Sequence, residues 1–105
     1  MSALRRYEIL LPLRFNNNQP VPPEVIADTV LKLREQFGAV SWENQTVQGQ
    51  WQYEGIVYRD DLVRVFVDVA DTLENRQFFL QIKEHVKTDF QQLDIWLTSY
   101  PIDVL

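Results

Sequence analysis

His85 is the one histidine of the chain and the first side chain to consider for chemistry. Asp89 follows four residues later, one turn away on a helix, where a carboxylate can orient and charge an imidazole that acts as a general base. A histidine on a helix flank, between core and solvent, is the alternative explanation. Neither a serine nor a second histidine stands at a spacing that would complete a catalytic triad or a metal site.

Two pairs of acidic residues have the chemistry to share a proton or hold Mg²⁺, namely Asp60 with Asp61 and Asp68 with Asp71. The first pair also suits a turn between strands, and Asp71 also suits a helix cap. The chain contains no cysteine, which excludes thiol catalysis, disulfides and thiolate metal sites. We therefore expect no metal and no cofactor.

Two arginines are weak candidates for binding a small carboxylate. Arg14 and Arg64 would form such a site if they were adjacent on one face of a sheet. The neighbouring acids Glu8 and Asp68 would satisfy the same guanidinium groups. The choice between a ligand and these internal partners depends on how the strands are paired.

The charge balance argues against nucleic acid as a partner. The chain has 15 acidic and 10 basic side chains, a formal net charge of −5, whereas nucleic-acid binding draws most of its affinity from neutralising phosphates. We therefore assign the aromatic residues of the centre and C-terminus to packing rather than to a base-stacking platform. These are Trp42, Trp51, Tyr53 and Trp96.

The same composition disfavours a membrane. Residues 1–6 contain no apolar run of signal-peptide length, and no stretch approaches the roughly 20 apolar residues of a membrane span. We expect a cytoplasmic protein. With 105 residues, of which 46% are hydrophobic and 24% charged, residues 1–105 are expected to form a single domain.

Hydrophobic periodicity predicts the elements of the N-terminal half. Alternation over residues 6–15 predicts a strand with Tyr7, Ile9 and Leu11 facing the core. Pro22-Pro23 suits a helix start, and Gly38 a helix end. The apolar stripe of this helix has helical spacing. It consists of Ile26, Val30, Leu33 and Phe37.

The C-terminal half is predicted to contain three strands, a helix and a last strand. After a short strand at 40–42, we expect turns at 48–49 and 59–61, which separate a strand over 51–58 from one over 62–69. Asp71 and Glu74 resemble the cap of a second helix, and 93–100 is the last strand, closed by Pro101. The second helix carries its own stripe. It consists of Phe79, Ile82, Val86 and Phe90.

The resulting order, β-α-β-β-β-α-β, predicts an α+β fold, a ferredoxin-like two-layer sandwich. Both helices lie on one face of an antiparallel-dominated sheet. This fold places the first strand in the middle of the sheet, where Pro12 would remove a ladder hydrogen bond. Either a bulge or a strand end at Pro12 would resolve the conflict.

The sheet face away from the helices is expected to be unusually apolar. The rings of Phe66, Trp96 and Tyr100 alone would contribute about 500 Å² of surface, as much as the largest apolar patch of a typical monomer. We expect this open face to form a homodimer interface. The predicted interface residues are Leu10, Leu62, Phe66, Trp96 and Tyr100, with Pro12 beside them. Alternatively, a hairpin over 40–58 folds back and covers the face, or a ligand or another protein does.

Four short segments resemble a group of small bacterial proteins of unknown function. They are Phe37-Gly38, Gly49-Gln50-Trp51, Arg59-Asp60 ahead of the Val-rich strand, and Phe90-Gln91-Gln92 ahead of the last strand. The resemblance covers about two-thirds of the chain and implies a compact ferredoxin-like or dimeric α/β-barrel domain. It implies no catalytic residues.

Three functions remain open. The first is a non-enzymatic binding or regulatory module that self-associates through the open face. The second is a small cofactor-independent enzyme of the dimeric α/β-barrel kind, which acts on an aromatic or quinone-like substrate with His85 as acid/base and Asp89 as its orienter. The third is a protein-partner module whose acidic surface meets a basic partner. This superfold hosts many unrelated functions, so the fold alone does not rank them.

Overall fold

The computed structural model describes residues 3–43 and 46–105. Met1 and Ser2 of the N-terminal segment, and Asn44 and Gln45 within the predicted 40–58 hairpin, lie outside the described residues. The predicted order of elements is confirmed. The elements are β1 (Leu4–Pro12), α1 (Pro23–Phe37), β2 (Ser41–Trp42), β3 (Val47–Tyr53), β4 (Ile56–Ala70), α2 (Leu73–Asp89) and β5 (Leu97–Ile102).

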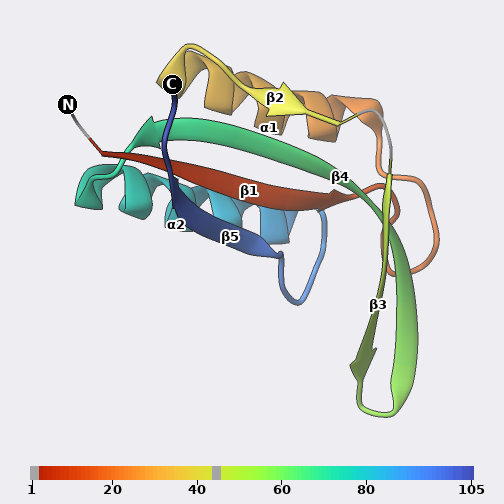
Figure 1. The fold of residues 1–105 in the computed structure, drawn as a ribbon. Coiled ribbons are helices and arrows are strands. Elements are labelled where there is room, and N and C mark those ends of the chain that lie inside the picture. Colours follow the sequence, from red (N-terminus) through yellow and green to blue (C-terminus); the bar gives the residue numbers. More distant parts are fainter. Residues whose placement is uncertain (1–2, 44–45) are drawn as a thin grey trace.

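The five strands form one antiparallel sheet in which β1 lies between β4 and β5. The second edge of β4 is shared, because β2 pairs with its C-terminal part and β3 with its N-terminal part. Both helices lie on one side of the sheet, and β3 with the first part of β4 extends well beyond them (Figure 1). The predicted ferredoxin-like α+β sandwich is confirmed.

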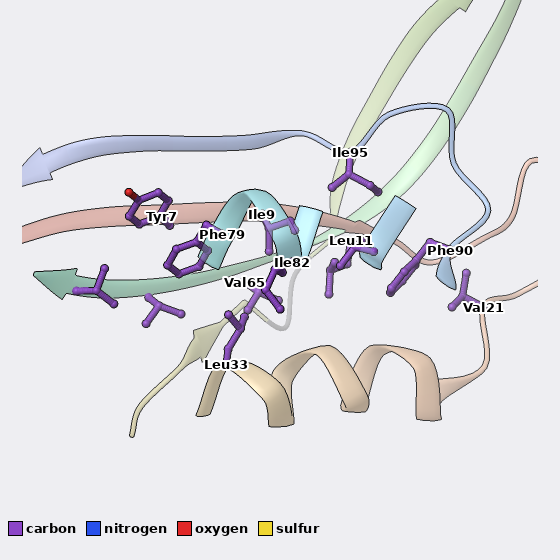
Figure 2. Close-up of a cluster of buried hydrophobic side chains, with 13 residues drawn as sticks. Tyr7, Ile9, Leu11, Val21, Leu33, Val65, Phe79, Ile82, Phe90 and Ile95 are labelled. Atoms are coloured by element: carbon purple, nitrogen blue, oxygen red, sulfur yellow. The ribbon is translucent and has the colours of Figure 1, made fainter. Parts of the chain in front are cut away.

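The core lies between the sheet and the two helices. Alternate residues of a strand point to opposite faces, so one face of β1 and β4 supplies buried Tyr7, Ile9, Leu11, Val65, Val67 and Val69. Helix α2 buries Phe79, Ile82 and Val86, as its stripe predicted. Figure 2 shows Phe79 and Ile82 in the cluster with the side chains of β1. The Tyr7 and Phe79 rings stack with centroids 4.0 Å apart, and Phe37 of α1 stacks on Phe79 at 5.2 Å. An aromatic stack therefore joins β1 to both helices.

The helix ends follow local chemistry. Pro23 begins α1, and Gly38 ends it with φ 81° while its N–H donates to the Arg34 carbonyl, as a left-handed C-cap requires. The predicted Asp71 cap of α2 is wrong by one residue. Thr72 is the N-cap and accepts from the Asn75 N–H at 3.2 Å, whereas Asp71 pairs with Arg5.

Pro12 is accommodated by a strand end. The Leu13 N–H donates to Asp61 on β4, and the Leu10 N–H donates to Trp96 on the β5 side. Because successive N–H groups of a central strand point to opposite neighbours, the donor that Pro12 lacks would point towards the β5 side. The β1–β5 register runs no farther than Ile9 opposite Leu97, so the proline deletes no bond of that ladder.

The predicted turns at 48–49 and 59–61 are wrong. Both segments lie in strands, with Gln48 opposite Asp61 and Gly49 opposite Asp60. The actual turn is Glu54-Gly55, where both residues have positive φ (49° and 79°), as a two-residue type I′ hairpin turn requires. The predicted strands over 51–58 and 62–69 are thereby replaced by a hairpin whose second strand, β4, is 15 residues long.

The hairpin formed by β3 and residues 56–61 of β4 is called the arm below. It extends the sheet lengthwise and does not fold back over the open face, so the alternative of an internally covered face is wrong (Figure 1). The predicted last strand is also displaced, because β5 begins at Leu97 and continues through Pro101. A proline is tolerated there because β5 is an edge strand of the sheet formed by the described residues.

The core assignment predicts different losses at two leucines of the same helix. Leu33 is 1% exposed and Leu31 is 38% exposed. We expect Leu33→Ala to lower the free energy of unfolding by about 2–5 kcal/mol, because it removes buried contacts and leaves a cavity. Leu31→Ala should lower it by about 0.5 kcal/mol. Urea denaturation measures both, and equal losses would contradict the placement of α1.

The arm turn makes a second, local prediction. Asparagine adopts positive φ more readily than glutamate, so Glu54→Asn should slow amide exchange in β3 about two- to fivefold. Gly55→Ala strains the turn and should accelerate the same exchange about tenfold. Amides of β1 serve as the internal control, because they exchange through opening of the core. A change of equal size in β1 would show that the arm and the body unfold together.

Candidate functional site

The open face is divided into a charged part and an apolar part. In the charged part, Arg6 makes two hydrogen bonds to Asp68 at 2.7 and 3.0 Å, which raise the pKa of Arg6 above its ordinary value. Arg64 donates to Glu8 at 3.2 Å and also pairs with Glu43 beside β2. Arg6 and Asp68 are direct partners in the β1–β4 ladder, and Glu8 and Arg64 belong to the next two rungs on the open face, with Arg64 diagonal to Glu8.

Two of the predicted interface residues belong to this charged part. Two guanidinium groups lie over the half-buried Phe66 ring, that of Arg6 at 4.7 Å and that of Arg64 at 5.2 Å from its centroid. Cations over an aromatic face are attracted by its quadrupole. Tyr100, which is 41% exposed, donates through its hydroxyl to Glu8 at 2.8 Å. The face orientation predicted for both rings is confirmed, since neither lies under the helices.

The apolar part of the open face continues onto the arm. Strand pairing places Val47, Trp51, Tyr53, Ile56, Tyr58 and Leu62 on the same face as Leu10 and Phe66. The opposite face of the arm carries Gln48, Gln50, Gln52, Arg59 and Asp61, with Val57 as its one apolar residue. The arm is therefore amphipathic, and it extends beyond both helices, so that neither α1 nor α2 covers its apolar face (Figure 1).

A groove of about 810 Å³ lies where the arm meets the body. Three predicted interface residues line it: Leu10, Leu62 and Trp96, of which Trp96 is 66% exposed. The segment that leads into β5 forms the other wall. The remaining lining residues are Pro12, Val47–Trp51, Tyr53, Asp60 and Gln92–Ile95.

Two carboxylates stand in the groove. Asp60 accepts from the Trp51 indole N–H at 2.7 Å, and the Trp51 ring stacks on Tyr58 at 4.3 Å. Asp94 pairs with Lys83 at 3.2 Å and accepts from the Ile95 N–H at 2.9 Å. Neighbouring parts of the chain remove some water from the exposed Asp94 carboxylate, which opposes its charged form, but these two donors outweigh that effect and hold the pKa of Asp94 below its ordinary value. Asp94 is therefore ionised at neutral pH.

A second, smaller cleft of about 490 Å³ lies on the helix side, between α1 and the edge of the sheet. Trp42, 54% exposed, and Val65 form its sheet wall, while Ile26, Val30 and Arg34 come from α1. Trp42 pairs opposite Val65, which places its ring on the face away from Trp51 and Trp96. The four aromatic residues singled out in the sequence therefore do not form one platform.

The residues predicted for acid–base chemistry lie apart from both hollows. His85 and Asp89 are exposed on α2, and neither lines the groove or the helix-side cleft. An exposed imidazole lacks the desolvated surroundings that enzymes use to tune a general base. The arrangement suits the alternative weighed for His85, a residue on a helix flank.

The predicted carboxylate site of two arginines is not formed. Arg14 lies beyond the end of β1 and donates to the Asn18 carbonyl at 3.2 Å, whereas Arg64 is held by Glu8 and Glu43. The adjacency of Arg14 and Arg64 is therefore wrong, because Leu10 and not Arg14 is the residue of β1 opposite Arg64.

The acidic pairs are separated as well. Asp60 and Asp61 are successive residues of β4 and point to opposite faces, so they cannot share a proton or an ion. Asp68 and Asp71 each pair with a different arginine, Arg6 and Arg5. Among residues 3–43 and 46–105, no three His, Cys, Asp or Glu side chains come together as metal ligands. Over the same residues, no helix is long and apolar enough to cross a membrane.

Sequence reasoning missed the groove and the arm that builds it. The signal was present in residues 47–53, where large apolar side chains alternate with three glutamines. Reading the period of two through Gly49 would have joined this segment into one strand. The approach of Gln92–Trp96 to the arm has no local signal, because it depends on where β5 enters the sheet.

The charged part of the open face predicts unequal effects at two carboxylates. Glu8 has a 14% exposed side chain and bonds both Arg64 and Tyr100, and the Arg64 Nε atom is buried without a partner among the described residues. Glu8→Ala should lower the free energy of unfolding by about 1–3 kcal/mol, because it leaves more of Arg64 unsatisfied. Asp68→Ala, on a pair about 30% exposed on each side, should lower it by less than about 1 kcal/mol. Thermal unfolding ranks the two variants, and a larger loss for Asp68→Ala would show that the Glu8 contacts are not the stronger ones.

Comparison with solved structures places the fold among known ones. A phage SAM lyase in complex with S-methyl-5′-thioadenosine superimposes with a TM-score of 0.69 at 14% identity, covering 99% of this chain and 92% of that one. CutA1 from Oryza sativa gives 0.65 at 12% identity (98% and 83% covered), and the divalent cation tolerance protein CutA1 from Thermus thermophilus gives 0.63 at 17% (96% and 85%). No family model and no curated protein matches the chain. At these identities the likeness shows the ferredoxin-like fold alone.

Proposed function

We propose that this protein is a non-enzymatic binding module that self-associates as a homodimer through its open face and arm. The observation that carries the proposal is the amphipathic arm, whose apolar face is continuous with the apolar part of the open face. Three of its side chains are substantially exposed: Tyr53 by 48%, Ile56 by 56% and Val47 by 37%. Alternation between apolar and polar faces is typical of a sheet that is covered on one side.

The surface area of the single chain supports a partner. A monomeric protein of 12.5 kDa is expected to expose about 6,200 Å², whereas this chain exposes 7221 Å². The excess of about 1,000 Å² is comparable to the roughly 800 Å² that each partner buries in a standard-sized interface. The radius of gyration of 14.3 Å also exceeds the roughly 13 Å of a compact chain of this length.

The marginal stability expected of the arm also favours a dimer. An isolated two-stranded hairpin is marginally stable in water, and the arm has only one aromatic stack among its described residues, Trp51 on Tyr58, to hold it. A second copy that covered its apolar face would add burial at about 25 cal/mol per Å². An isologous contact needs a self-complementary surface, and a predominantly apolar face meets that need.

The charged part of the open face plays a different role in this proposal. Its carboxylates and guanidinium groups are already paired within the chain, so they gain little from new partners across an interface. We therefore place Leu10, Leu62 and Trp96 together with the arm at the centre of the contact, and Phe66 and Tyr100 nearer its rim. A polar rim around an apolar centre is the usual anatomy of an interface.

The test is the mass of the protein in solution. At tens of micromolar we expect light scattering after size exclusion to give twice the mass of the chain. Trp96→Glu and Ile56→Glu should each raise the dimer dissociation constant by about 30-fold, because truncating a central apolar anchor or burying a charge there costs about 2 kcal/mol.

Leu73→Glu is the matched control, since Leu73 is 69% exposed on α2, on the other side of the sheet. It should leave the mass unchanged. A wild-type monomer at these concentrations, or equal dissociation by the control, would refute the proposal. If light scattering gave three times the mass of the chain, and the same two variants lowered it, self-association through this surface would be supported but the oligomer would be a trimer and not a dimer. A mass that doubles only when another protein is added would favour the protein-partner function.

A further inference from the structure

We propose that the groove between the arm and the body binds a flat aromatic ligand that carries a positive charge. This inference rests on the proposed function in treating the protein as a binding module. The ligand and a second copy would compete for one surface, because Leu10, Leu62 and Trp96 line the groove and also lie at the centre of the proposed dimer contact. All the residues that form the groove come from one chain, so the site exists before any second copy is added. No residue of the groove is part of the charged network around Arg64.

The shape and surface of the groove suit a planar ring. Leu10, Leu62 and Pro12 form an apolar floor at the end of β1 and the middle of β4. Trp96 projects from the lead into β5 with 66% of its surface exposed, and Trp51 comes from the arm. Aromatic side chains with free faces stack on planar ligands, and such stacking contributes substantially to affinity.

The Trp51 side of the groove is fixed in position. Its indole N–H donates to Asp60 at 2.7 Å, and its ring stacks on Tyr58 with 14° between the planes. Gly49 lies beside it, where an added Cβ would come within 3.4 Å of the Leu62 side chain. A larger residue at position 49 would fill part of the groove, so glycine keeps the floor open.

The negative charge of the groove favours a ligand with a positive charge. The lining contains two carboxylates, Asp60 and Asp94, and among its described residues it contains no lysine, arginine or histidine. Lys83, which is not part of the lining, is paired with Asp94 at 3.2 Å and so is not free for an anion. Carboxylates beside an apolar, partly desolvated surface attract a cation and repel an anion.

Asp60 is the carboxylate best placed to meet the ligand. It is half-buried on the groove side of β4, and within residues 3–43 and 46–105 its one side-chain hydrogen bond is the one from Trp51 to Oδ2. Its second oxygen is therefore available to a cationic donor or to the positive edge of a charged ring. The faces of the two indole rings also attract cations. The indoles and the carboxylate together therefore favour an aromatic cation over a neutral ring.

The experiment compares three flat bicyclic probes of nearly equal size: 1-methylquinolinium, neutral quinoline and 1-naphthoate. Binding is followed through the three indole N–H signals in ¹⁵N-correlated NMR spectra, assigned with single Trp→Phe variants. We expect 1-methylquinolinium to shift the Trp51 and Trp96 signals and to leave Trp42 unchanged. Trp42 is an internal control, because it lies in the helix-side cleft on the other face of the sheet.

Two variants test the residues. Asp60→Asn keeps an acceptor for the Trp51 indole but removes the charge, so it should weaken 1-methylquinolinium about fivefold and leave quinoline unchanged. Trp96→Ala should weaken both probes about tenfold. Asp103→Asn, an exposed carboxylate outside the groove, is the matched control and should change neither affinity.

Several outcomes would overturn the inference. They are tighter binding of 1-naphthoate than of the cation, equal shifts at Trp42, and an Asp60→Asn variant that binds the cation as well as wild type. The mass of each sample separates this inference from the proposed function. Because the two compete, 1-methylquinolinium should lower the mass of a dimer towards that of one chain, which would support both proposals. Cation binding by a protein that is monomeric without ligand would support the site and refute the dimer. Ile56→Glu, expected to be monomeric and altered outside the groove lining, should bind the cation, and failure of this variant to bind any probe would refute the site alone.

Discussion

The pairing of β1 with β4 determines both surfaces of this molecule. Nine residue pairs hold the two strands in a single register, and that register sends Tyr7, Ile9 and Leu11 to one side and Glu8 and Leu10 to the other. Both helices cover the first side, so everything on the second must be satisfied within the sheet or by something outside the chain. A slip of one residue would exchange the two sets and bury an ion-pair network beneath α2.

The side chains of the open face differ between its two ends. Near the chain termini, arginines and carboxylates of β1 and β4 neutralise one another, and two of the guanidinium groups lie over the Phe66 ring. Towards the arm there are few charges, and apolar side chains remain in contact with water. The groove and the proposed contact both lie at the arm end because the apolar side chains there can still be buried by a partner. The charged groups at the other end are already paired within the chain and would gain little from one.

Much of this architecture could be predicted from local patterns. Three confirmed predictions depend only on residues close together in the sequence. They are the apolar stripes of α1 and α2, the alternation in β1 and the C-terminal part of β4, and the end of α1 at the left-handed Gly38. The hairpin was misplaced because Arg59-Asp60-Asp61 has the composition of a turn, whereas Glu54 has no strong preference for the positive φ that it adopts. Here the long β-pairing of β4 overrode local propensity.

The groove could not be predicted in the same way, because its walls come from segments that lie far apart in the sequence. Trp96 and Leu10 were placed correctly on the open face, but their neighbours from β3 depended on a hairpin whose turn was misplaced. The Arg14–Arg64 pairing failed for a related reason, since it assumed that β1 continues past Pro12. Errors at strand ends therefore affect sites more than they affect the fold.

β4 belongs to the body and to the arm without interruption, and it curves from one into the other (Figure 1). At about 3.4 Å per residue, a strand of 15 residues spans roughly 50 Å, close to the 47 Å of the molecule's longest dimension. No loop intervenes at which the arm could swivel, so its direction is set when the core folds. A ligand or second subunit therefore meets an arm whose direction relative to the core is already set, so association does not have to select one orientation from many.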